Sequence, residues 1–270
     1  GIFLVIICGF IFMGGVDRLA SVTEKLVPVM AAFFLIGGLG VLAMRLQYIP
    51  ETFGLIFKYA FQPQAIIGGG FGIAIKTAVS QGAKRGLFSN EAGMGSTPHA
   101  HALALVKNPH EQGCVAMVGV FIDTFIVLTL NALVIISTLY AGNGPLANGY
   151  VGEAANTLKN TNLAQVAFGV VYGDKAGAVF VAICLFFFAF STILGWNLFA
   201  KINVTYLFGK KAQRPFMLVA LVFIFLGTIG ESDLVWACSD MFNQLMVIPN
   251  AIALFALTGV VTKILGDRDK

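Results

Sequence analysis

Long uninterrupted apolar runs are the feature that most limits what this sequence can fold into. They lie at residues 2–15, 26–44, 66–83, 114–140, 177–200, 215–230 and 234–262. A helix needs roughly 20 apolar residues to cross the hydrocarbon layer of a bilayer, so the runs predict about seven transmembrane segments. Because that layer offers no water to the backbone, and because the runs do not alternate with polar residues, we expect helices. The predicted fold class is an all-α polytopic membrane protein.

The composition agrees with this and sets an orientation. Hydrophobic residues make up 58% of the chain and charged residues only 11%, whereas a soluble chain needs more polar side chains on its surface. Short loops that are rich in lysine and arginine stay on the cytoplasmic side of the membrane. If the run at 2–15 passes inward, the outer loops hold only Arg45, Lys58, Lys159 and Lys175. We expect a multi-pass protein of the plasma (inner) membrane with a cytoplasmic C-terminus.

Other partners and chemistries have little support in the sequence. Basic inner loops facing anionic lipid account for the net charge of +4, so we expect no nucleic acid partner. The sequence contains no HExxH, GxSxG or P-loop pattern, which argues against the commoner membrane hydrolases and against direct coupling to ATP. The four cysteines form no CxxC pair, and the three histidines match no zinc pattern. We expect no enzyme, no cofactor and no resident metal.

Two outer segments carry more character than plain connectors. Residues 51–61, ETFGLIFKYAF, mix apolar and charged side chains and can form an amphipathic helix at the interface. Residues 141–175 predict a structured loop with a short helix across the outer mouth. A plain exposed linker is the alternative for each.

Glycines cluster in the run at 66–83, within the stretch IIGGGFGIA. Gly68, Gly69, Gly70 and Gly72 each lower helix stability relative to alanine. A helix that unwinds there exposes backbone groups, which is tolerated in a membrane where they line a cavity or a ligand site. The alternative is a face of small residues for close helix packing. Glycine content alone does not separate these two interpretations.

Polar residues gather directly after that run. The stretch KRGLFSNEAGMGSTPHAHA (84–102), followed by QGCVAMVGVFIDT (112–124), closely resembles the alanine or glycine:cation symporter family. The later FFFAFSTILGWNLFAK (186–201) and LMVIPNAIALFALTGVV (245–261) are similar to the same family. The resemblance covers essentially the whole chain, in order.

The resemblance implies a secondary active symporter that imports alanine or glycine, coupled to sodium or, in some members, to protons. It also implies a LeuT-type fold of two inverted five-helix repeats. We expect one transporter domain, with the end of the first repeat and an outer loop at 1–65, a complete second repeat at 66–264 and a cytoplasmic tail at 265–270. The run at 2–15 starts without a methionine, so we expect an N-terminally truncated chain. An uncoupled channel, a non-transporting membrane subunit and a membrane-embedded enzyme are the alternatives.

The resemblance and the chemistry together predict a cation site and a substrate site. Sodium prefers several hard oxygen ligands, as calcium does, and the resemblance places the cation-binding hydroxyls at Ser191 and Thr192. The alternative for both is a hydrogen bond to a carbonyl one turn earlier. We expect the unwound backbone of Gly68, Gly69, Gly70, Phe71 and Gly72 to bind the amino acid, with the side chains of Phe71 and Trp196 limiting its size.

Polar residues elsewhere predict gating and structural roles. For Asn90 and Glu91 we expect an inner gate that caps helix ends and bonds across the cytoplasmic mouth. A helix start, with an N-cap followed by a first-turn acid, is the simpler alternative. A carboxylate within a membrane segment is a functional hypothesis by default, and for Asp123, beside Thr124, we favour an ion pair with Lys76 or a basic inner-loop residue over a proton relay.

Overall fold

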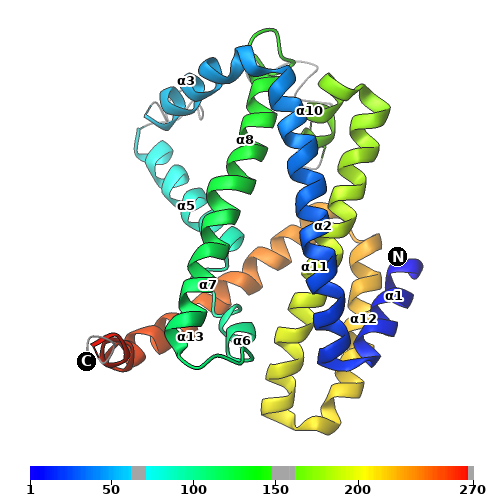
Figure 1. The fold of residues 1–270 in the computed structure, drawn as a ribbon, viewed down its shortest axis with the longest axis vertical. Helices are drawn as coiled ribbons and strands as arrows, with labels where there is room; N and C mark the ends of the chain where they lie inside the picture. Colours follow the sequence, from blue (N-terminus) through cyan, green and yellow to red (C-terminus); the bar gives the residue numbers. More distant parts are fainter. Residues whose placement is uncertain (62–70, 148–157, 159–161, 267–270) are drawn as a thin grey trace. The chain divides into compact units, whose positions relative to one another are not determined.

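The computed structural model describes residues 1–61, 71–147, 158 and 162–266, and this part of the chain is helical without a β-strand. Figure 1 shows its α-helices. They are α1 (Ile2–Met13), α2 (Gly15–Met44), α3 (Ile49–Ala60), α5 (Phe71–Asn90), α6 (Pro98–His101), α7 (Pro109–Phe121), α8 (Thr129–Ile135), α10 (Leu163–Tyr172), α11 (Asp174–Phe208), α12 (Gln213–Ile229) and α13 (Ser232–Gly266). The predicted all-α class is confirmed.

Within the described residues, five helical stretches are long and apolar enough to cross a membrane. They are Arg18–Met44, Pro109–Tyr140, Asp174–Phe208, Lys210–Ile229 and Asp233–Ile264. These match the apolar runs predicted at 26–44, 114–140, 177–200, 215–230 and 234–262. The run at 2–15 forms α1, a shorter apolar helix of 12 residues. The run at 66–83 lies within the described residues only from 71 onward, where it forms the start of α5.

Both outer segments contain the helices that the sequence suggested. Residues 51–61 lie almost entirely in α3, which begins with a proline in its first turn, where the missing N–H costs nothing. The segment 141–175 contains α10. A helix in each segment is therefore confirmed over a plain linker, while the predicted places of these helices at the interface and across the outer mouth stay predictions.

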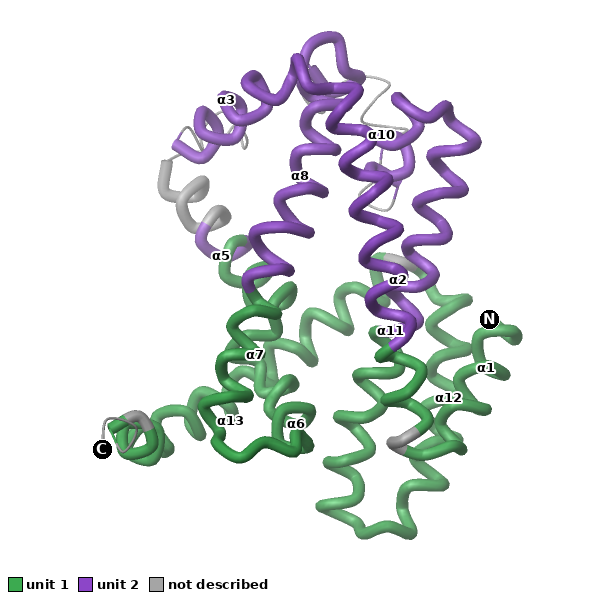
Figure 2. The backbone as a smooth tube through the Cα atoms, viewed as in Figure 1, with its two compact units in different colours: residues 1–24, 82–120, 192–270 green, residues 25–81, 121–191 purple. Residues whose placement is uncertain are grey.

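The chain divides into two compact units, coloured separately in Figure 2. Unit 1 consists of residues 1–24, 82–120 and 192–270, and unit 2 of residues 25–81 and 121–191. In unit 1, α1 packs against α12. This unit also contains the C-terminal part of α5, the polar stretch after it, and α13.

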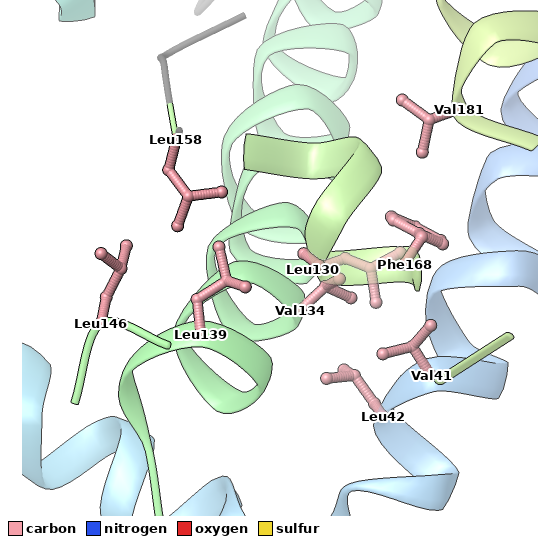
Figure 3. Close-up of a cluster of buried hydrophobic side chains, with 10 residues drawn as sticks. Val41, Leu42, Leu130, Val134, Leu139, Leu146, Leu158, Phe168 and Val181 are labelled. Carbon is pink, nitrogen blue, oxygen red and sulfur yellow. The ribbon is translucent and has the colours of Figure 1, made fainter. Parts of the chain in front are cut away.

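Unit 2 is built around a cluster of buried apolar side chains (Figure 3). Phe168 of α10 is fully buried, and its ring stacks on that of Phe180 of α11 at a centroid distance of 5.0 Å. Val41 of α2 and Val134 of α8 are fully buried in the same cluster. The cluster therefore holds α2, α8, α10 and the first half of α11 together.

The helical stretch Pro109–Tyr140 departs twice from α-helical winding along its length. Two π-helical segments, η2 (Ile122–Leu128) and η3 (Ile136–Tyr140), flank α8.

The guanidinium of Arg45 donates to the carbonyl of Ser137 in η3, from Nε at 3.0 Å and from Nη2 at 2.5 Å. The same group lies 3.8 Å from the ring centroid of Tyr48, in the 3₁₀ turn η1 (Leu46–Tyr48). A cation thus binds one of the last carbonyls of a long helix, where the helix dipole favours it.

Candidate functional site

The polar stretch after α5 forms a tight loop with a repeated backbone conformation. Helix α5 ends at Asn90, and Glu91, Gly93 and Gly95 follow with φ angles of 52°, 87° and 86°. Positive φ is easy for glycine but uncommon for a residue with a side chain, and Glu91 is the one non-glycine residue in the described ranges that has it. Ser89 and Asn90 therefore end a helix. The alternative that this stretch begins a helix is wrong.

The side chain of Glu91 closes this loop. Its Oε2 accepts a hydrogen bond of 2.6 Å from the hydroxyl of Ser96, which is buried. The N–H of Met94 donates to the carbonyl of Glu91 at 3.3 Å, and the Met94 side chain is only 2% exposed. The carboxylate of Glu91 thus stabilises a compact turn. Its predicted contacts across a cytoplasmic mouth stay a prediction.

Helix α13 holds the same loop from the side. The Nδ2 atom of Asn250 donates to the carbonyl of Gly93 at 2.9 Å. A Cβ atom added to Gly95 would lie 2.9 Å from the Cβ of Asn250, closer than real Cβ atoms approach. Gly95 is thus required by its backbone angle and by its neighbour. The loop and α13 fit together at the level of single atoms.

An ion pair joins the end of α5 to α13. The Nζ atom of Lys84 lies 2.5 Å from Oδ2 of Asp240, and Nη1 of Arg85 lies 3.6 Å from the other carboxylate oxygen. The side chain of Asp240 is only 12% exposed. The Arg85 guanidinium also lies 6.0 Å from the ring of Trp236, and Phe88 packs on that ring at 6.0 Å. The largely buried carboxylate is therefore matched by nearby cations.

His99, in α6, connects the loop to α11. Its Nδ1 lies 2.9 Å from the carbonyl of Ser96, and since a carbonyl oxygen only accepts, the proton belongs to Nδ1. In the neutral ring, Nε2 then accepts from Nδ2 of Asn203 at 2.9 Å. Among the described residues no group of three or more His, Cys, Asp and Glu side chains could hold a metal ion. We interpret His99 as a hydrogen-bonding bridge.

The predicted cation-binding hydroxyls lie in the middle of α11. The Ser191 hydroxyl donates to the carbonyl of Phe188 at 3.0 Å and lies 3.5 Å from Sδ of Met30. This is the local back-bonding arrangement that the sequence left open, made here to the residue three positions earlier. Thr192 is exposed in unit 1. Trp196, one turn later, is half-buried and meets Phe199 edge-on at 5.9 Å. The cation role of both hydroxyls stays a prediction.

The predicted substrate-binding backbone lies mostly outside the described residues. Gly68, Gly69 and Gly70 fall in the stretch 62–70, which is not described. Phe71 and Gly72 begin α5 and are helical, and the side chain of Phe71 is outside the description. The expected unwound backbone is therefore wrong at Phe71 and Gly72, and at Gly68, Gly69 and Gly70 it stays a prediction.

Asp123 and Thr124 lie in the π-helical segment η2. A π turn leaves a local irregularity in the backbone hydrogen bonding, and such turns are frequent at functional sites. The hydroxyl of Thr129 donates to the carbonyl of Thr124 at 3.2 Å, across five residues. The predicted pairing of Asp123 with Lys76 stays a prediction, because the side chain of Lys76 is outside the description.

The comparison with known proteins decides the family. The model of the sodium:alanine symporter family matches residues 1–270. The chain belongs to the sodium:alanine symporter family.

Several relatives in this family are named as transporters rather than as enzymes. The chain is 40% identical over its whole length to an uncharacterised transporter of Haemophilus influenzae, covering 54% of that protein. It is 38% identical to the sodium/alanine symporter AgcS of Methanococcus maripaludis, over 97% of the chain and 54% of that protein. It is 36% identical to the sodium/proton-dependent alanine carrier protein of Bacillus sp. strain PS3, over 95% of the chain and 58% of that protein. The chain thus spans about half the length of these relatives.

Sequence reasoning missed three residues that contact the end of α5, the loop after it or His99. Asp240 lies within the apolar run at 234–262, so the argument that singled out Asp123 applies equally to it. Asn250 directly follows Pro249 inside α13. A proline within a membrane helix frees a backbone carbonyl, so a polar residue beside it was a detectable signal. Asn203 had no such signal, because nothing local in the sequence indicates its pairing with His99.

Proposed function

We propose that this member of the sodium:alanine symporter family imports a small neutral amino acid, alanine first, coupled to the entry of sodium. The observation that carries the proposal is the match of the family model to every residue of the chain. The relatives named as alanine symporters or carriers support the substrate. The five long apolar helices found in the described part of the chain support a protein that spans a membrane.

The proposed architecture is the LeuT-type inverted repeat, with residues 66–264 forming the second five-helix repeat and residues 1–65 the end of the first. Residues 265–270 form a tail on the cytoplasmic side of the plasma membrane. Alternating access then requires one group of helices to rock against the other around a central site. Sodium moving inward supplies the driving force, since one charge crossing 100 mV contributes about 2.3 kcal/mol.

For the coupling site we propose Ser191 and Thr192 as sodium ligands, and for the substrate site the backbone of 68–72 with Trp196 as an apolar wall. Hydroxyl and carbonyl oxygens suit sodium because they are hard, neutral ligands. The Ser191 hydroxyl, which donates to Phe188, keeps lone pairs for a cation while it donates. Asn90 and Glu91 serve as gating residues, and Asp123, beside Thr124, forms a structural or gating ion pair.

Uptake of radiolabelled alanine into proteoliposomes tests the proposal. The proteoliposomes contain the protein expressed from the complete reading frame that encodes this chain, and uptake is measured with and without an inward sodium gradient. We expect sodium-dependent uptake that Thr192→Val reduces at least about tenfold, because a methyl group replaces a ligand oxygen. Thr258→Val is the matched control. Its hydroxyl back-bonds to Leu254 at 2.9 Å on α13, outside the proposed cation site.

Two changes of the ion gradients separate the alternatives. Uptake that is driven by a proton gradient in the absence of sodium would identify protons as the coupling ion, as the name of the Bacillus sp. strain PS3 relative allows. Equal uptake with no gradient of either ion would indicate an uncoupled channel. Competition by unlabelled glycine and glutamine measures specificity, since another relative, from Bacillus subtilis, is named as a probable sodium/glutamine symporter.

A further inference from the structure

Residues 84–95 are attached to α13 at two points that the transport roles above do not use. The first is the ion pair between Lys84 and Asp240. The second is the hydrogen bond from Asn250 to the carbonyl of Gly93. Asp240 and Asn250 are ten residues apart, which is about 15 Å along a helix. The two attachments therefore fix both the end of α5 and the loop after it.

The two attachments differ in the kind of interaction that must be lost to break them. The Asn250 attachment depends on shape, because its Cβ fills the space that a side chain at position 95 would need. The ion pair is electrostatic and partly accessible to solvent, since the Lys84 side chain is 27% exposed. Ion pairs in such settings gain little over the separated, hydrated ions. The ion pair is thus the attachment that opens more readily.

The surroundings of the ion pair can also accommodate its opening. Lys84 and Asp240 line a small cavity together with the amides of Asn243 and Gln244. Amide groups can solvate a carboxylate or an ammonium group that has left its partner. The same cavity is lined by Met94, whose side chain is almost fully buried. Opening of the ion pair on this cavity should therefore make the Met94 side chain more accessible.

We propose that Lys84 and Asp240, with Arg85 as a second cation, form a clasp between α5 and α13 that opens and closes during the transport cycle, while Asn250 stays on the loop as a hinge point. Asp240 is here a positioning residue, since it acts by holding the end of α5. The part of the proposal that concerns the transport cycle rests on the proposed function. The existence of the clasp does not.

Cysteine labelling at position 94 tests the clasp without measuring transport. Met94→Cys is placed in a background with Cys114→Ser and Cys238→Ser, which leaves the buried Cys8 and Cys184. We expect Asp240→Asn to raise the rate of maleimide labelling roughly tenfold in permeabilised membranes, because the change leaves the cation without its partner. Asp233→Asn, an exposed aspartate on the same helix, is the matched control and should leave the rate unchanged.

The second cation gives the test a graded form. Arg85 lies 3.6 Å from the Asp240 carboxylate, so Lys84→Ala alone should raise labelling less than Lys84→Ala with Arg85→Ala. The double change should match Asp240→Asn. Asp240→Lys should label fast, and adding Lys84→Asp should slow labelling again by restoring opposite charges. This rescue distinguishes an opened clasp from a misfolded protein.

The outcomes separate the clasp from the proposed function. Equal labelling of Asp240→Asn and Asp233→Asn would overturn the clasp. A wild-type labelling rate that changes when sodium and alanine are added together supports its opening in the transport cycle. An unchanged rate, in protein that does take up alanine, would overturn that part alone. Uptake that ignores sodium would overturn the proposed function, while the comparison of the two aspartate variants would still decide the clasp.

Discussion

Gly95 combines two constraints at a single residue. Its φ of 86° is unfavourable for any residue with a side chain, and a Cβ there would lie 2.9 Å from the Cβ of Asn250. We expect Gly95→Ala to lower the free energy of unfolding by about 2 kcal/mol, with roughly 1 kcal/mol from the backbone and the rest from the contact. Thermal unfolding of the detergent-purified protein measures the change.

A double substitution separates the two contributions at Gly95. In an Asn250→Ala background, an alanine at position 95 should cost less than it does beside Asn250, because the shorter side chain leaves more room. The difference between the two costs is the coupling between the sites. Gly119→Ala serves as the control, since Gly119 is helical and a Cβ there meets nothing within 4 Å. An equal cost of Gly95→Ala in both backgrounds would show that the contact contributes nothing.

At the scale of elements, Arg45 joins the end of α2 to the end of the long helix that finishes in η3. Its guanidinium makes two hydrogen bonds to the Ser137 carbonyl and lies over the ring of Tyr48. We expect Arg45→Met to destabilise the protein by about 1.5–3 kcal/mol, the usual contribution of hydrogen bonds from a charged group. Arg45→Lys should recover only part of this, because an ammonium group lacks the planar fork.

Lys58→Met provides the comparison for Arg45. Lys58 lies 5.5 Å from the ring of Tyr59 on α3, and both residues are exposed. In this pair a cation also lies over an aromatic ring, but no hydrogen bond like that from Arg45 to the Ser137 carbonyl accompanies it in the described contacts. A change in the unfolding temperature as large as that of Arg45→Met would contradict the role given to the Ser137 carbonyl.

The elements show what the sequence could and could not predict. Apolar runs predicted five of the long helices because a bilayer demands length and hydrophobicity, and both can be counted. Helix α5 continues past the predicted end at 83 to Asn90, and its Lys84 pairs with Asp240, on a helix far away in sequence that the apolar pattern does not connect to it. The fit of Asn250 against Gly93 and Gly95 was equally beyond prediction, since it depends on which segments meet. The π turns in η2 and η3 have no pattern that periodicity would detect.

For the whole molecule, the orientation in the membrane is the property that the distribution of charge predicts. Lys210, Lys211 and Arg214 lie around the junction of α11 and α12, and Lys84 and Arg85 lie in the last turns of α5. Translocating such clusters across a membrane is unfavourable, so they favour the cytoplasmic side. By contrast, the segment between η3 and α10 begins with uncharged residues, at 141–147.

Reporter fusions test this orientation. Green fluorescent protein fused after Lys270 should fluoresce, and alkaline phosphatase at the same position should be inactive, because fluorescence needs the cytoplasm and the phosphatase needs the oxidising side. The reverse is expected for both reporters inserted after Gly144, in the segment that follows η3. Replacing Lys210, Lys211 and Arg214 with glutamine should weaken the preference and produce a mixed signal, since the positive-inside rule depends on those charges. An active phosphatase after Lys270 in the unmodified chain would overturn the orientation, and with it the assignment of Asn90 and Glu91 to an inner gate.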